Sequence, residues 1–405
     1  MSPDTINEEQ FRADAVAFLE ANAKSKQEET VAWGEGSDKV GLLAEKTFEE
    51  EMEEVREGKA WKAQVFDAGF GWITGPSQYG GRELPSSYER VWQAEVAQFD
   101  TPSEQPFGIG LGMVAPTILA HATDKVKDAY LRKMYRGDIV GCQLFSEPAA
   151  GSDLAGLQGR AVRDGDEWVL NGQKIWMTFG TRADWFYVLC RTNADAPKHQ
   201  GLSLILVPAH QRGVDVRPIR NLAGGEEFAE VFFSDARTRA DLVVGPVDGA
   251  WSVVMGTVGT ERGTTALPYQ AAFEQQLHDL VGELRERGRT DDPVVRQRLA
   301  QAWIGLQLNR HNNARMLTRL VRDGTLGPEA SLSKLFWSHW HRDVGALMMD
   351  LLGADATVVG DGWSLDPFQT VFLNSRAETI YGSANEIQRN IVAERLLGLP
   401  KEPRV

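Results

Sequence analysis

Two short segments carry residues that could bind a flat ring system bearing phosphates. The first is Phe145-Ser146-Glu147-Pro148-Ala149-Ala150-Gly151-Ser152-Asp153, and the second is Asn171-Gly172-Gln173-Lys174-Ile175-Trp176-Met177-Thr178. A turn rich in serine and glycine offers N–H and hydroxyl donors to a phosphate or a ring edge. A tryptophan two residues before a threonine can lay an indole against a flat ring and set a hydroxyl beside it. Together, in this order, the segments indicate a flavin site built on β-structure.

Three zones of different hydrophobic pattern would position these segments. Residues 1–137 follow a helical period, residues 138–247 alternate as strands do, and residues 248–405 are helical again. Many short strands with Gly and Asp turns predict a small barrel or sandwich in the middle zone. Long neighbouring helices predict a bundle in the last zone. The expected fold is therefore α+β and multidomain.

Local patterns add predictions that a structure can test. The acidic run at residues 49–54 is typical of a solvated helix face. Asp164-Gly165-Asp166 predicts a turn between two strands, and Asn171-Gly172 predicts a second turn. Later strands are expected at residues 185–189, 202–207, 214–216 and 229–233, and later helices at residues 294–321, 331–352 and 384–397.

The composition excludes several classes of protein. The 405 residues exceed what one hydrophobic core usually fills, so two or three domains are expected. A net charge of −14 makes nucleic acid an unexpected partner, because phosphate binding needs a basic face. No apolar run approaches the about 20 residues that cross a bilayer. The first residues lack a basic segment followed by an apolar run, so the cytoplasm is the expected location.

Other candidates for chemistry are better explained as structure. Cys142 and Cys190 stand among apolar neighbours and are predicted to be buried thiols, too few for a disulfide framework. His339 and His341 would diverge by about 200° on a helix, and no cluster of further ligands completes a site, so no metal is expected. The glycine series at residues 108–112 lacks the strand and the spacing of a dinucleotide-binding loop.

The order of zones and the two segments resemble the acyl-CoA dehydrogenase family. Residues 145–153 are similar to the family's first signature, residues 171–178 to its flavin strand, and residues 380–390 to its C-terminal signature. The likeness covers nearly the whole chain. It implies a helical N-terminal domain over residues 1–137, a central β-barrel over 138–247 and a C-terminal four-helix bundle over 248–405.

The resemblance also implies a cofactor and a reaction. A member of the family binds FAD, removes a proton from Cα of an acyl-CoA thioester and a hydride from Cβ, and releases the trans-2-enoyl-CoA. It passes the electrons to electron transfer flavoprotein. The positions implied to contact FAD are Phe145 and Ser146 at the pyrimidine edge, Ser152 with Gly151 at the pyrophosphate, Trp176 on the ring face and Thr178 near N5.

The catalytic base departs from the commoner family pattern. Many members place it at the Glu of Ile-Tyr-Glu-Gly-Thr, a position that Gly382 occupies here. Glu386 follows in the last predicted helix and is not assigned the role. A minority places the base on the first long helix of the C-terminal domain, where Glu261 stands, and Gly382 would leave space for that carboxylate. Glu261 is therefore the predicted base. The alternative is an ordinary glutamate at a helix start, favoured by the helix dipole.

Three further residues are candidates for the substrate side, together with Gly382. Arg262 could steady the Glu261 carboxylate or the thioester, or it could form a surface ion pair. Phe107 and Leu111 lie in the region that the family uses near its acyl pocket, and with the adjacent glycines they could shape a roomy cavity.

The half of the cofactor site that joins family subunits is altered in this sequence. Homotetrameric members usually carry Arg-x-x-Phe-Gly, whose arginine reaches the FAD pyrophosphate of a neighbouring subunit. Residues 285–293 lack the Phe-Gly, which leaves Arg287 and Arg289 as candidates for that contact. Residues 350–355 also differ from the usual pattern. Such losses resemble bacterial members that act on bulky CoA thioesters, including sterol side chains, some of which pair two different chains.

The leading prediction is an FAD-dependent acyl-CoA dehydrogenase that forms a homodimer, a homotetramer or a two-chain heterotetramer. One alternative is a non-catalytic or half-site subunit of a heteromeric dehydrogenase, which the altered segments favour. Another is an acyl-CoA oxidase, although 405 residues lack the extra C-terminal domain that many oxidases carry. The retained flavin strand and the candidate base favour a catalytic chain.

Overall fold

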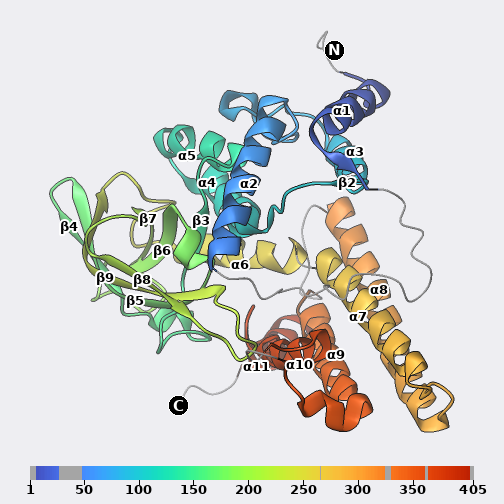
Figure 1. Cartoon of the computed structure of the whole chain (residues 1–405). Coiled ribbons are helices and arrows are strands. Elements are labelled where there is room, and N and C mark those ends of the chain that lie inside the picture. The colour runs from blue at the N-terminus through green and yellow to red at the C-terminus, as the bar shows by residue number, and fades with distance from the viewer. Residues whose placement is uncertain (1–5, 27–47, 265, 324–329, 361–363, 402–405) are drawn as a thin grey trace. The chain divides into compact units, whose positions relative to one another are not determined.

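The computed structural model describes residues 6–26, 48–264, 266–323, 330–360 and 364–401 (Figure 1). These residues form two compact units. Among the described residues, the first unit contains those up to residue 219 and residues 227–255. The second unit contains residues 220–226 and those from residue 256 onward. The N-terminal helices and the middle sheet thus share one unit, and the C-terminal helices form the other.

The described part of the first unit begins with five N-terminal helices, of which the first three share an aromatic core. They are α1 (Glu8–Asn22), α2 (Phe48–Asp67), α3 (Ser86–Val96), α4 (Ala115–His121) and α5 (Asp124–Arg136), with a small sheet of β1 (Lys24–Ser25) and β2 (Phe99–Asp100). Phe11 meets Phe70 and Tyr88 edge to face, and Phe70 stacks on Trp92 with 4.6 Å between ring centroids. The predicted helical zone is confirmed.

A seven-stranded sheet forms the rest of the first unit (Figure 1). Its strands are β3 (Gly141–Leu144), β4 (Arg160–Asp164), β5 (Glu167–Thr178), β6 (Trp185–Arg191), β7 (Leu202–Pro208), β8 (Val214–Ile219) and β9 (Phe228–Arg239). The order is β3-β6-β4-β5-β9-β8, with β7 paired to β6. The four later strands predicted from the sequence are confirmed as parts of β6, β7, β8 and β9.

The sheet curls around one core, as the prediction of a small barrel requires. Buried side chains from β3, β5, β6, β7 and β9 belong to a single apolar cluster, which includes Cys142, Leu170, Val188, Val207 and Val231. The end of β9 and the chain after it reach β7. Thr238 Oγ1 donates a hydrogen bond to the carbonyl oxygen of Leu206 at 2.7 Å, and Val243 forms an isolated bridge with Ile205.

One predicted turn is confirmed and the other is wrong. The β4–β5 hairpin turns at Gly165, whose φ is +57°. At Asn171-Gly172 the chain continues as β5. Gly172 has φ +148°, and a Cβ there would lie 2.7 Å from Cα of Gly159. Gly172 permits the backbone of β5 to approach that of Gly159 closely. The dipeptide Asn171-Gly172 alone does not distinguish this use of glycine from a turn.

The acidic run on α2 is not entirely solvated, contrary to the prediction. Glu51 is buried and forms an ion pair with buried Arg182, which follows β5. Further along α2, Lys59 Nζ lies 2.8 Å from Oδ2 of Asp184. These two pairs attach α2 to the segment between β5 and β6, so part of the charge run serves to join helices and sheet within the first unit.

Four helices of the second unit share a core, which confirms the predicted C-terminal bundle. They are α7 (Ala266–Glu286), α8 (Pro293–Asp323), α9 (Ala330–Leu352) and α10 (Pro367–Ala377). Their common apolar cluster includes Leu280, Leu306, Met348 and Val371. Helix α6 (Trp251–Thr264) precedes them, and α11 (Asn385–Ile391) follows with a π-helical turn at Val392–Leu396. Within the described residues, none of these or the other helices combines the length and apolar character that a membrane crossing needs.

Gly172→Ala is expected to destabilise the protein strongly, because its Cβ would collide with Gly159 and φ +148° is a region that L side chains rarely adopt. Gly165→Ala is the matched control. Its φ of +57° is also left-handed, but no described heavy atom beyond the adjacent residues lies within 4 Å of the added Cβ. We expect it to cost about 1–2 kcal/mol. Thermal unfolding followed by circular dichroism compares the two, and equal losses of Tm would contradict the close-approach explanation.

Candidate active site

Strand β5 carries a bulge where the second segment presents its tryptophan. Between Lys174 and Met177 the strand has two residues, Ile175 and Trp176, where β9 has one. A bulge bends the strand and re-aims the extra side chain. The backbone of Trp176 is left-handed, with φ +66°, which is a rare conformation for a large side chain.

This conformation leaves the indole of Trp176 at the surface of the described chain. Trp176 is 58% exposed, although Lys174 and Met177 on either side are buried. The ring of Phe228 meets the indole at 81°, with 6.2 Å between centroids. A strained, exposed indole forgoes the apolar contacts of the core, and it offers a stacking surface to a flat ligand ring.

A buried thiol holds the backbone of Thr178 at the end of the same strand. Cys142 Sγ on β3 donates to the carbonyl oxygen of Thr178 at 3.2 Å. Burial raises the pKa of Cys142 to about 12, so the thiol stays protonated and remains a donor near neutral pH. Burial likewise raises the pKa of Cys190 to about 12. Both cysteines are free and buried, as predicted.

The loop after β3 folds into a tight turn. Glu147 and Ala150 exchange two backbone hydrogen bonds of 3.0 and 3.1 Å. Gly151 and Ser152 follow this turn and are exposed, and no described heavy atom lies within 4 Å of where a Cβ on Gly151 would be. The backbone beside these two residues is therefore accessible to a phosphate-sized group.

A buried ion pair joins this loop to β5. Lys174 Nζ lies 2.8 Å from Oε1 of Glu147 and 3.0 Å from the carbonyl oxygen of Phe145. The Glu147 carboxylate also accepts hydrogen bonds from the backbone N–H groups of Gln158 at 2.7 Å and Gly159 at 2.9 Å. Glu147 is 9% exposed and Lys174 is 1% exposed. Three donors on one buried carboxylate fix the spacing between the loop and the strand.

The structure thus brings the two predicted flavin segments together. Besides the ion pair, the N–H of Ile175 donates to the carbonyl oxygen of Ser146 at 3.1 Å. Phe145 is buried beside this junction, with its ring centroid 5.8 Å from that of Tyr187. The individual contacts that these residues make with FAD stay predictions.

Gln143 lies near this junction and was not recognised in the sequence. Its neighbours on β3, Cys142 and Leu144, belong to the sheet core, so the alternation of a strand directs Gln143 to the other face. Its Oε1 is buried without a hydrogen-bond partner among the described residues. An unsatisfied buried oxygen costs about 1–3 kcal/mol, which a donor from a bound cofactor would offset. The site therefore fits FAD. A polar residue between two apolar ones, just before the first signature, was the available signal.

Glu261 and Arg262 belong to α6, and their side chains lie outside the described part of the chain. Glu261 lies ten residues beyond Trp251, the first residue of α6. It does not stand at the helix start, so the alternative explanation, a glutamate favoured by the dipole there, is wrong. The catalytic role of Glu261 and the role of Arg262 stay predictions.

Gly382 lies in the loop between α10 and α11, with φ +60°. A residue with a side chain would pay about 1–2 kcal/mol for this left-handed backbone. The loop conformation thus favours glycine at residue 382. By the family resemblance, this is the position at which many other members carry the catalytic glutamate.

The two arginines predicted to reach a neighbouring FAD have partners within the second unit. Arg287 forms ion pairs of 2.5 Å with Glu283 and with Asp355. Arg289 donates to the carbonyl oxygen of Leu351. Two carboxylates beside Arg287 offset the charge that would attract a pyrophosphate. The cofactor role of these arginines stays a prediction, and for Arg287 it would require separation from both carboxylates.

The predicted acyl-pocket residues lie at the start of a helical segment of the first unit. Phe107 is buried in a small apolar cluster, and Leu111 packs partly against it from the π-helix Gly110–Val114. For Gly108 and Gly112, no described heavy atom other than those of the chain neighbours and the local helix backbone lies within 4 Å of an added Cβ. The two glycines therefore border open space, whereas the substrate contacts of Phe107 and Leu111 stay predictions.

Lys174→Met would leave Glu147 buried without its partner, which is expected to cost about 3–5 kcal/mol. It should also lower the FAD content, because the loop and the strand lose their fixed spacing. Lys198→Met is the matched control. Lys198 pairs at 2.7 Å with Asp153 of the same loop, but both side chains are more than half exposed and the pair is worth at most about 1 kcal/mol. Flavin absorbance per chain after gel filtration measures the outcome. Full FAD content in Lys174→Met would contradict the positioning role.

Comparison with known proteins gives matches to three successive family domains. The N-terminal domain of acyl-CoA dehydrogenase matches residues 5–138, the middle domain matches residues 142–236, and the C-terminal domain matches residues 248–397.

Relatives and solved structures agree with these matches. Acyl-CoA dehydrogenase IpdE1 of Mycobacterium tuberculosis is 40% identical over 355 residues, which cover 87% of this chain and 91% of that protein. The solved Tcur3481-Tcur3483 steroid ACAD is 27% identical with a TM-score of 0.74, covering 98% of this chain and 98% of that one. The ChsE4-ChsE5 complex from Mycobacterium tuberculosis shares the fold, with a TM-score of 0.69 at 24% identity and coverage of 99% and 100%. The chain belongs to the acyl-CoA dehydrogenase family of FAD-dependent oxidoreductases.

Proposed function

We propose that the chain catalyses the α,β-dehydrogenation of a bulky, steroid-derived acyl-CoA thioester to its trans-2-enoyl-CoA. The observation that carries the proposal is the junction at which Lys174 joins the loop of Glu147 to the bulge that exposes Trp176. A left-handed backbone that exposes a large ring is typical of a functional site, which favours a chain that binds its own flavin. FAD, when bound, supplies the acceptor for the hydride that leaves Cβ.

The protein's part in holding FAD falls to residues of the loop and the bulge. Trp176 would lie against the ring face, Thr178 would offer its hydroxyl beside it, and Ser152 with Gly151 would meet the phosphates. Phe145 and Ser146 would border the ring edge, and Gln143 would accept a hydrogen bond through its buried Oε1.

Glu261 would remove the Cα proton. This proton is weakly acidic, so its removal needs a positioned carboxylate in a dry site, together with donors to the thioester oxygen. The left-handed glycine at 382 supports the assignment, because no side chain at that position can act as the base. Arg262 would steady either the Glu261 carboxylate or the thioester.

Two observations support a bulky acyl group. The relative named a steroid ACAD is 27% identical over nearly the whole chain. In addition, open space lies where the Cβ atoms of Gly108 and Gly112 would be, and we take this space to be part of the acyl pocket. Phe107 and Leu111 are proposed to frame this pocket beside the two glycines.

The proposed acceptor of the electrons is electron transfer flavoprotein, and molecular oxygen is the alternative that would make the enzyme an oxidase. The cytoplasm stays the expected location. A second candidate function is that of one subunit in a two-chain assembly. It is favoured by Arg287, whose carboxylate partners oppose a contact with the FAD of an identical neighbour. A homodimer or homotetramer remains the other proposed assembly.

Glu261→Gln is expected to keep FAD and to lose nearly all turnover, because an amide cannot accept the Cα proton. Glu286→Gln, an exposed glutamate at the end of α7, is the control and should retain the wild-type rate. Anaerobic stopped-flow reduction of the flavin by an acyl-CoA measures the chemical step. A Glu261→Gln rate above a tenth of wild type would show that another group is the base.

Gly112→Leu is expected to narrow the acyl pocket. Gly112 lacks a positive φ, so a side chain there adds volume without backbone strain. We expect kcat/KM for a steroid-derived acyl-CoA to fall about tenfold or more, because even one extra methylene in a pocket can change kcat/KM by that much. The value for a short straight-chain acyl-CoA should change less than twofold. A parallel loss for both substrates would place the acyl group elsewhere.

A further inference from the structure

The loop between α10 and α11 has an unfavourable backbone that the surrounding protein must support. Gly382 and Ser383 are consecutive and both left-handed, with φ +60° and φ +73°. Ser383 carries a side chain, so its conformation is one that residues adopt only where neighbouring groups impose it. Such strain concentrates at functional sites.

A buried lysine lies under this loop. Lys334 on α9 is 6% exposed, and its Nζ donates to the carbonyl oxygen of Ser383 at 2.9 Å and to Oδ1 of Asn385 at 3.0 Å. Burying an ammonium group costs more than burying an apolar side chain of similar size. The hydrogen bonds to Ser383 and Asn385 therefore indicate that the buried lysine holds the loop in one conformation.

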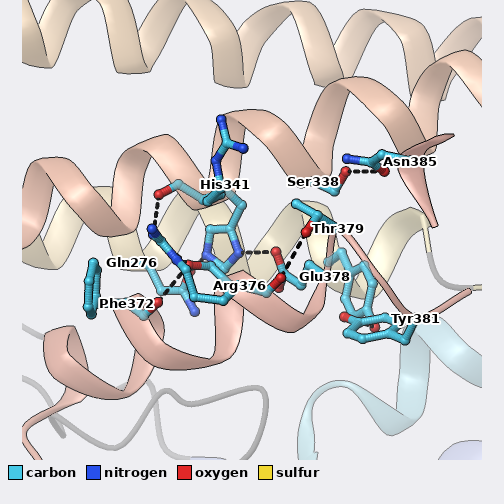
Figure 2. A network of polar contacts seen from close by, with 12 residues as sticks. Gln276, Ser338, His341, Phe372, Arg376, Glu378, Thr379, Tyr381 and Asn385 are labelled. Atoms are coloured by element: carbon cyan, nitrogen blue, oxygen red, sulfur yellow. Dashed lines mark hydrogen bonds and ion pairs between the residues drawn. The ribbon is translucent and has the colours of Figure 1, made fainter. Parts of the chain in front are cut away.

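Buried polar groups around Lys334 hold the rest of the loop. Ser338 Oγ donates to Oδ1 of Asn385 at 3.1 Å (Figure 2). Gln388 Nε2 donates to the carbonyl oxygen of Gly382 at 3.1 Å. The N–H of Asn385 donates to the carbonyl oxygen of Thr379 at 3.0 Å. The carbonyl groups of both left-handed residues therefore have side-chain donors.

The same face of α9 holds the chain just before the loop. His341 Nδ1 lies 2.7 Å from Oε2 of Glu378, and its Nε2 lies 2.7 Å from Oε1 of Gln276 on α7 (Figure 2). All three side chains are buried. Lys334, Ser338 and His341 are spaced by four and three residues, so they lie along one side of the helix. That side therefore fixes the loop at both ends.

We propose that Lys334 is a positioning residue of the acyl-CoA site, holding residues 379–385 in the conformation in which Gly382 and Ser383 are left-handed and Tyr381 is in place. The Tyr381 hydroxyl lies 3.2 Å from the hydroxyl of Tyr269, which is near the start of α7 and eight residues beyond the proposed base in the sequence. If the loop were displaced, Tyr381 would move, and Gly382 would no longer occupy its present position. The inference rests on the proposed function and adds to it the residue that shapes the substrate side.

The test compares Lys334→Met with Ser333→Ala. Ser333 is the buried neighbour of Lys334 on α9, but its hydroxyl donates at 3.1 Å to Oδ1 of Asn313 on α8, not to the loop. Both variants lose buried hydrogen bonds of the same helix. Anaerobic reduction of the flavin at increasing acyl-CoA concentration gives the apparent Kd and the limiting rate, at a temperature where circular dichroism shows each variant folded. Hydrogen exchange measured by mass spectrometry reports the loop at residues 379–388.

We expect Lys334→Met to raise the apparent Kd at least tenfold and to speed exchange in residues 379–388, while Ser333→Ala changes both less than twofold. Equal Kd and equal loop exchange in the two variants would overturn the role of Lys334. Should Lys334→Met fail to fold, Gln388→Leu removes the donor to Gly382 instead. We expect it to raise Kd at least threefold, and an unchanged Kd would likewise overturn the proposal.

The outcome with the wild-type protein separates this inference from the proposed function. If no acyl-CoA reduces the flavin of the wild-type chain, the proposed function and the role of Lys334 are both wrong. If the wild-type chain is active and Lys334→Met behaves like Ser333→Ala, only the role of Lys334 is wrong.

Discussion

The buried ion pair between Glu147 and Lys174 is the contact on which the flavin surface depends. The lysine reaches both the carboxylate and the carbonyl oxygen of Phe145, so it ties the loop after β3 to the strand that carries Trp176. The pair also constrains the glycines around it. A Cβ on Gly159 would lie 2.6 Å from the Glu147 carboxylate, and one on Gly172 would lie 2.7 Å from Gly159. Close backbone approach around a buried charge thus explains why the second segment contains a glycine within a continuous strand.

Both units use the same physical device, in which buried polar groups impose a backbone that would be unfavourable alone. In the first unit, the N–H of Ile175, next to left-handed Trp176, donates to the carbonyl oxygen of Ser146, in the loop that Lys174 binds. In the second, Lys334 donates to the carbonyl oxygen of left-handed Ser383. Each lysine is more costly to bury than an apolar side chain. The cost is understandable if Trp176 must face the flavin ring and if the loop between α10 and α11 must hold Gly382 in place beside the substrate.

The periodicity of the sequence was sufficient for the three zones, the later strands and the helices of the bundle, because each depends on a repeat within a short window. The motif also predicted a strand at residues 171–178, which lies within β5. What the sequence did not reveal depends on partners far apart in the chain. Glu51 looks like its acidic neighbours until Arg182 is folded against it, and Lys174 stands 27 residues from Glu147. Asn171-Gly172 predicts a turn because Asn-Gly is a common hairpin signal, but here the dipeptide serves a close approach of two backbones within a strand.

The central claim is that this chain holds FAD by itself and uses it on an acyl-CoA thioester. The most direct measurement is the visible absorption spectrum of the chain purified alone, repeated anaerobically with straight-chain and steroid-derived acyl-CoAs. We expect flavin bands that bleach with a steroid-derived thioester, since the junction around Lys174 and Trp176 lies within one chain. A colourless protein, or a yellow one that no acyl-CoA bleaches, would contradict the account. A colourless protein that gains flavin only with a second, different chain would show that the site belongs to a two-chain assembly.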